Sequence, residues 1–114
     1  MLINSINIPR QLLVALNQLY EIEQKLRRHG DPAHIQRNIE KIKAAYSDGG
    51  LFYEDPMGQP FNETRTDLEA TISGADTSSL VVVEVIKPII RAGKKEFSTV
   101  VQRGIVVVEK DNSL

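Results

Sequence analysis

The sequence contains no cysteine and no tryptophan, and it has only three tyrosines and three phenylalanines in 114 residues. The absence of cysteine excludes disulfide bonds, thiol nucleophiles and cysteine-ligated zinc sites. Because aromatic side chains are scarce, the hydrophobic core has to be built from valine, isoleucine and leucine. A chain of this length is expected to form one domain, or one small domain with an added helical element.

The sequence also lacks an excess of charge and a long hydrophobic run. Its 14 basic and 15 acidic residues give a formal net charge of -1, so there is no overall basic field to attract nucleic acid or anionic lipid. No apolar run approaches the roughly 20 residues that cross a bilayer, and residues 1–6 lack the charged start and long apolar region of a signal peptide. We therefore expect a cytoplasmic protein that binds neither nucleic acid nor membrane.

A heptad pattern of apolar residues runs through the first quarter of the chain and predicts a helix that ends at Gly30. Leu13, Leu16 and Tyr20 widen this stripe beyond a minimal coiled-coil seam, which is typical of a helix covered by more than one neighbour. The seam itself consists of Ile8, Leu12, Ala15, Leu19, Ile22 and Leu26.

Asp31 and Pro32 predict the start of a second helix, with Asp31 as the cap and Pro32 at the first helical position. The short connection predicts an antiparallel hairpin. Two helices with wide apolar stripes cannot bury them fully against each other, so we expect a second copy of the chain to complete a four-helix bundle. The alternative is that both stripes pack on the rest of the same chain. The expected dimer contacts are Leu12, Leu16, Leu19, Ile22, Leu26, Ile35, Ile39 and Ile42.

Asp48-Gly49-Gly50 breaks the helical pattern and predicts a boundary between a helical region, residues 1–48, and a β region, residues 49–114. Runs of β-branched residues predict strands at 80–87, 97–102 and 105–110, with a weaker strand at 69–73. Pro88 is expected to end the pairing of the first of these, and residues 91–95 are expected to form a hairpin loop. The predicted fold class is α+β: a helical hairpin followed by a small antiparallel all-β domain.

The residue types that carry catalysis are not arranged for it. His29 and His34 flank a Gly-Asp-Pro turn instead of sharing a helix face, so we expect no metal site. Glu54 and Asp55 are adjacent and would point to opposite faces of a strand, so they cannot act as a carboxylate pair. We therefore expect a protein that is not an enzyme and that has no cofactor.

Several motifs resemble those of GrpE, the nucleotide exchange factor of DnaK-type chaperones. The segment Pro56-Met57-Gly58-Gln59-Pro60-Phe61-Asn62 is similar to the pattern Pro-x-Gly-x-x-Phe-Asp that opens the family's β domain. The segment Glu84-Val85-Ile86-Lys87-Pro88 resembles the family's Glu-Val-Leu-Gln-Pro, and residues 100–108 are similar to its closing segment. The family's histidine has no counterpart, and Ile89-Ile90 stands in place of its Gly-Tyr pair.

The resemblance implies a homodimeric co-chaperone of protein folding and the stress response. Its β domain would bind the nucleotide-binding domain of a DnaK-type chaperone, favour the open form and accelerate ADP release. An alternative of a different class is a dimeric adaptor that binds another protein without exchange activity. The residues implied as partner contacts are Lys87, Ile89, Arg91, Lys94, Lys95 and Val106, although Val106 could instead pack in the core.

Overall fold

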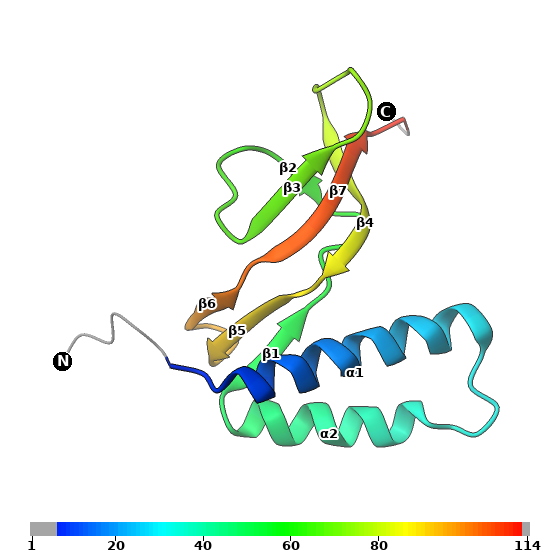
Figure 1. The fold of residues 1–114 in the computed structure, drawn as a ribbon, viewed down its shortest axis with the longest axis vertical. Helices are drawn as coiled ribbons and strands as arrows, with labels where there is room; N and C mark the ends of the chain where they lie inside the picture. Colours follow the sequence, from blue (N-terminus) through cyan, green and yellow to red (C-terminus); the bar gives the residue numbers. More distant parts are fainter. Residues whose placement is uncertain (1–6, 113–114) are drawn as a thin grey trace.

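The computed structural model describes residues 7–112, so the expectation for residues 1–6 lies outside the described residues. The described chain forms a helical hairpin followed by a β domain (Figure 1), which confirms the α+β class. The elements are α1 (Arg10–His29), α2 (Gln36–Asp48), β1 (Leu51–Glu54), β2 (Pro60–Phe61), β3 (Leu68–Ile72), β4 (Leu80–Lys87), β5 (Ile89–Gly93), β6 (Ser98–Gln102) and β7 (Gly104–Lys110).

The ends of the helices follow local chemistry. Gly30 ends α1 with a positive φ of 88°, and its N–H donates to the carbonyl oxygen of Leu26 at 2.7 Å. The prediction that Pro32 opens the second helix is wrong, because α2 begins only at Gln36. The Asp31 carboxylate still acts on the start of α2, since it accepts hydrogen bonds from the backbone N–H groups of Ile35 at 2.7 Å and Gln36 at 2.8 Å.

The strands form two sheets, one with the order β1-β5-β6 and one with the order β2-β4-β7-β3. The prediction of a purely antiparallel domain is wrong, because β3 pairs in parallel with β7. After β3 the segment 73–79 crosses the end of β7 and enters β4 on the opposite side. Since β4 is antiparallel to β7 and β3 is parallel to it, the two strands that the segment joins run in opposite directions on the two sides of β7.

The predicted strands at 80–87 and 105–110 are confirmed by β4 and β7, and the weaker one at 69–73 by β3. The predicted hairpin loop at 91–95 is wrong, because β5 continues to Gly93. A tighter turn follows, in which Lys94 and Phe97 exchange two backbone hydrogen bonds of 2.8 and 3.0 Å. Pro88 ends β4 as predicted and is fully buried where the chain passes from one sheet to the other.

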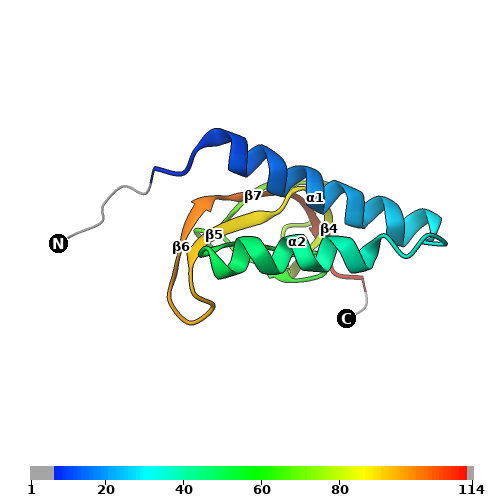
Figure 2. The same ribbon diagram turned by 90° about the horizontal axis from the view of Figure 1, so that it is seen from below.

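Two hydrophobic cores meet at β5. Ile89 and Ile90 are adjacent, so they point to opposite faces of the strand. Ile89 joins the core of the β domain, together with Leu68, Leu80, Val82, Val106 and Val108. Ile90 joins a second core, together with Leu16, Leu19, Ile39 and Leu51, which attaches both helices to β1 and β5. Viewed from below, the helices therefore form a layer that lies across one end of the β domain (Figure 2).

Candidate protein-binding surfaces

A buried carboxylate connects the two helices to β1. Glu23 of α1 is 3% exposed. Its carboxylate accepts hydrogen bonds from Gln36 Nε2 at 2.7 Å, from Lys43 Nζ at 3.3 Å and from the hydroxyl of Tyr53. This cluster is not among the sites predicted from the sequence, although a charged residue inside the apolar stripe of a predicted helix is a signal for it.

The surroundings of Glu23 determine its charge. Burial by itself raises the pKa of this carboxyl, but the hydrogen bonds from Tyr53 and Gln36 and the positive charge of Lys43 outweigh it, so the pKa lies below its usual value. Burial, together with the neighbouring carboxylate, raises the pKa of the Tyr53 hydroxyl. At neutral pH Glu23 is therefore ionised and Tyr53 is neutral. The hydrogen bond between them holds β1 against α1.

Lowering the pH is expected to remove the stabilisation that Glu23 provides. Because its pKa is depressed in the folded chain, this stabilisation is fully present above the usual value of 4.5 and is lost as the pH falls through the lower folded-state pKa. The free energy of unfolding is measured with urea from about pH 3 to pH 7 for the unmodified protein and for Glu23→Gln. The difference between the two proteins should be constant above about pH 5 and should decrease below about pH 4. A difference in free energy of unfolding that does not change with pH would contradict the lowered pKa of Glu23.

The prediction that Ile89 and Val106 contact a partner is wrong. Ile89 is 1% exposed and Val106 is fully buried, and both pack inside the core of the β domain. In a strand with one face on the core, alternate side chains point inward, and these two occupy inward positions. Neither side chain can touch a partner without unfolding the domain.

Arg91 is held by contacts within the chain. Its guanidinium donates to Glu54 of β1 at 2.5 Å and to Asp67 at 3.2 Å. Asp67 also accepts two hydrogen bonds from Arg65, which are the main cause of its lowered pKa. This network ties β5 to β1 and to the segment before β3, so the primary role of Arg91 in the structure is to hold these elements together.

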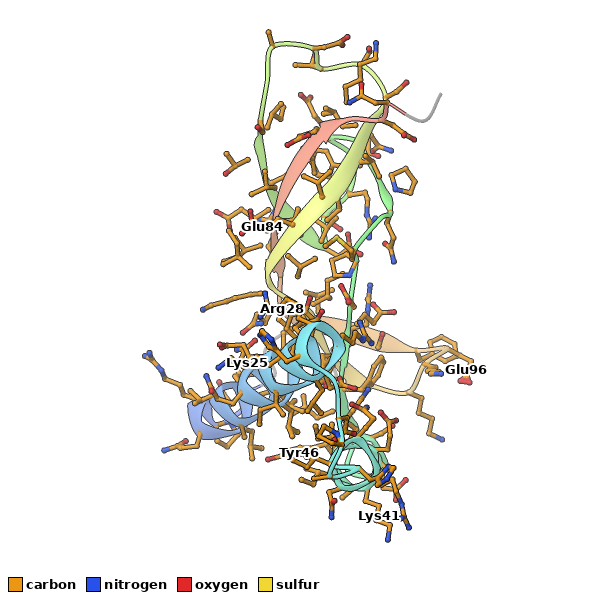
Figure 3. All side chains as sticks on the ribbon, turned by 90° about the vertical axis from the view of Figure 1, so that its right-hand side faces the viewer. Lys25, Arg28, Lys41, Tyr46, Glu84 and Glu96 are labelled. Atoms are coloured by element: carbon orange, nitrogen blue, oxygen red, sulfur yellow. The ribbon has the colours of Figure 1, made fainter. Side chains whose placement is uncertain are left out.

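The remaining predicted contacts are accessible. Lys87, Lys94 and Lys95 are exposed, and the last two lie at the tip of the β5–β6 hairpin. The same tip carries Phe97, which is 85% exposed. Figure 3 shows this hairpin, marked by Glu96, extending away from the helices and from the larger sheet. The sequence analysis placed Phe97 in a strand and so missed it as a surface residue.

The predicted dimer contacts divide into two groups. Leu16, Leu19 and Ile39 are wrong as contacts between copies, because they are buried within the chain in the core around Ile90. Leu26 is half-buried and packs against the same core. The others remain exposed, at 37% for Leu12, 41% for Ile22, 44% for Ile35 and 43% for Ile42.

The exposed residues of this second group come from α1, from the connection just before α2 and from α2. On α1, Tyr20 faces the β domain, where its hydroxyl donates to Asp55 at 3.3 Å. Ile22 follows two residues later and so points about 200° around the helix from Tyr20. We call Leu12, Ile22, Ile35 and Ile42 the outer helical face.

A cleft of about 500 Å³ separates α1 from β4. Met57 and Ile86 line it and are 54% and 55% exposed. Lys25 and Arg28 of α1 and Glu84 of β4 stand at its walls. The sequence analysis did not assign these residues to a site, because only the packing of α1 across the end of the β domain brings them together.

Among residues 7–112 there is no cluster of three or more side chains that could hold a metal ion, and no helix in that range is long and apolar enough to cross a membrane. Comparison of the chain with protein-family models, with curated proteins and with solved structures finds no match. The geometry offers three exposed surfaces for binding proteins: the hairpin tip, the outer helical face and the cleft.

Proposed function

We propose that this protein is a GrpE-like co-chaperone, a cytoplasmic homodimer that accelerates ADP release from a DnaK-type chaperone by binding its nucleotide-binding domain. The observation that carries the proposal is that residues 56–62, one of the segments that resemble the family, pair with the first half of β4, the strand that leads into the other segment, residues 84–88. The loop before β2 is hydrogen-bonded to β4, because Gly58 N–H donates to the carbonyl of Val82 at 3.0 Å and Val82 N–H donates to the carbonyl of Gln59 at 2.9 Å. The loop before β2 and strand β4 thus pack together in the β domain that follows the helical hairpin.

The proposed mechanism is differential binding and needs no catalytic group. A partner that binds the open form of the nucleotide-binding domain more tightly than the closed form increases the open population, and ADP leaves faster from it. The hairpin tip suits such a contact because an exposed aromatic side chain can anchor an interface while lysines at the rim attract an acidic surface. Lys94, Lys95 and Phe97 of the tip, together with Lys87 at the end of β4, are the residues we assign to the chaperone contact.

The outer helical face is the proposed dimer interface. Its four exposed aliphatic side chains are of the kind that another helical pair buries in a four-helix bundle. A second copy of the chain offers the same stripe, so a two-fold axis would pair like with like. The β domains would then extend from the two sides of the bundle.

Aspartate at Ile22 and Ile42 is expected to convert the dimer to a monomer, since two charges would be buried at the interface of each copy. Sedimentation equilibrium should give the mass of two chains for the unmodified protein and of one chain for the double variant. Val83→Asp serves as the control, because Val83 is similarly exposed, at 39%, but lies on β4. An unmodified protein that stays monomeric at high concentration would rule out this interface.

The exchange activity is tested by the release of labelled ADP from a DnaK-type chaperone. Micromolar protein is expected to accelerate release at least about fivefold. Lys94→Glu combined with Lys95→Glu should remove most of the acceleration by reversing the charge of the hairpin tip. Lys41→Glu is the matched control, because this exposed lysine lies on α2 and not on the hairpin tip (Figure 3).

The alternative, an adaptor without exchange activity, is favoured by one observation. Of the six residues that the resemblance implies as contacts, Ile89 and Val106 are buried and Arg91 is paired within the chain. A dimer that shows no acceleration of ADP release would support the adaptor and contradict the exchange factor.

A further inference from the structure

The cleft between α1 and β4 is held open by contacts inside the chain. Asp55 connects its two sides, because its carboxylate accepts hydrogen bonds from the Tyr20 hydroxyl at 3.3 Å, from Arg27 at 3.4 Å and from the backbone N–H of Met57 at 3.0 Å. Tyr20 and Arg27 belong to α1, whereas Met57 lies in the loop that is hydrogen-bonded to β4. The cleft is therefore preformed, and a ligand would not have to order it.

One edge of β4 faces no other strand along this cleft. On that edge, β2 pairs only with Leu80 and Val81, and loop residues Gly58 and Gln59 then pair with Val82. Within residues 7–112, no further strand pairs with residues 83–86 there, while β7 occupies the opposite edge. A strand edge with unpaired backbone groups is a template for an added strand.

The side chains around this edge define what could pair with it. Met57 and Ile86 present apolar surface, and Lys25 and Arg28 stand on the helical wall. Two carboxylates also line the cleft: Glu21 of α1, which accepts a hydrogen bond from Gln18 at 3.1 Å, and Glu84 on the opposite wall, on β4. Neither of these two cations has an ion-pair partner among the described residues. Figure 3 shows both on the side of the molecule that carries Glu84, away from the hairpin tip.

We propose that this cleft binds a short, extended, acidic peptide segment of another protein by strand addition to β4. Backbone groups of the segment would pair with the free edge, an apolar side chain would lie between Met57 and Ile86, and a carboxylate would face Lys25 and Arg28. Irregular pairing of β4 with β7 brackets the free edge, between Val82 and Glu84 and between Val85 and Lys87. Because bulges bend a strand, the segment is limited to a few residues.

The test uses a fluorescein-labelled hexapeptide of alternating valine and glutamate, with fluorescence anisotropy as the readout. Binding with a dissociation constant below about 1 mM is expected. The same peptide with every backbone N–H methylated should bind at least about tenfold more weakly, since it cannot donate backbone hydrogen bonds. A peptide of alternating valine and lysine should also bind at least about tenfold more weakly, because it meets two cations.

Glutamate at Lys25 and Arg28, or serine at Ile86, should weaken binding of the acidic peptide about tenfold, whereas Lys41→Glu should leave it unchanged. Thermal unfolding of each variant verifies that the fold is retained. No binding of the acidic peptide at about 1 mM, equal binding of its N-methylated form, or equal binding of the lysine peptide would each overturn the proposal. These measurements contain no chaperone, so their outcome is independent of the exchange activity.

Discussion

Replacing Gly93 with alanine is expected to lower the free energy of unfolding by about 3 kcal/mol. Gly93 has a φ of 126°, a conformation that side-chain-bearing residues rarely adopt. A Cβ at this position would also lie 2.3 Å from the carbonyl oxygen of Phe97 and 3.0 Å from the Cα of Ser98. Both neighbours are backbone atoms of the same hairpin, so they cannot move aside without breaking the pairing of β5 with β6.

Urea unfolding followed by circular dichroism measures this loss, and the melting temperature should fall by about 10 °C or more. Gly74→Ala is the matched control, because Gly74 has a φ of 94° and a Cβ there would meet nothing within 4 Å. The free energy of unfolding of Gly74→Ala should be lower than that of the unmodified protein by only about 1 kcal/mol, because only the backbone conformation is unfavourable there. Equal losses for the two variants would show that the contact with Phe97 does not matter.

Replacing Glu23 with alanine is expected to cost about 3 kcal/mol of unfolding free energy. The substitution removes the acceptor shared by Gln36, Lys43 and Tyr53. The hydroxyl of Tyr53, which is half-buried, then has lost its carboxylate partner. The loss should appear in the attachment of the helices to the β domain, because these three partners lie on α2 and β1 while Glu23 lies on α1.

Glu40→Ala is the control for this prediction. Glu40 also contacts Gln36 and Lys43, at 2.6 and 3.6 Å, but its side chain is 57% exposed. Solvent replaces such a partner at little cost, so its removal should change the unfolding free energy by less than about 0.5 kcal/mol. Urea unfolding at pH 7 of both variants provides the comparison. A cost for Glu23→Ala as small as for Glu40→Ala would contradict a structural role for the buried carboxylate.

Local sequence signals predicted most of the elements. The heptad seam and Gly30 predicted α1, and the runs of β-branched residues predicted β4 and β7. The hairpin loop was misplaced because Arg91-Ala92-Gly93 contains turn-forming glycine, whereas pairing of β5 with both β1 and β6 keeps these residues in a strand. Local propensity is overridden where two neighbouring strands supply hydrogen bonds.

The candidate sites could be predicted only in part. Exposed lysines at 94 and 95 follow from their place in a polar turn, but the burial of Ile89 and Val106 depends on which face of each strand meets the core. Periodicity identifies an apolar stripe without saying what covers it. For this reason the apolar stripe of α1 predicts dimer contacts, although Leu16 and Leu19 pack on the same chain and Ile22 is exposed.

The sequence by itself determined the order of a helical hairpin and a β domain, because hydrophobic period and glycine and proline positions are local properties of the chain. Only the tertiary structure decided the parallel pairing of β3 with β7, the buried position of Glu23 and the cleft between α1 and β4. Each of these depends on contacts between residues distant in the sequence. Such contacts are selected by the packing of whole elements, which no local pattern records.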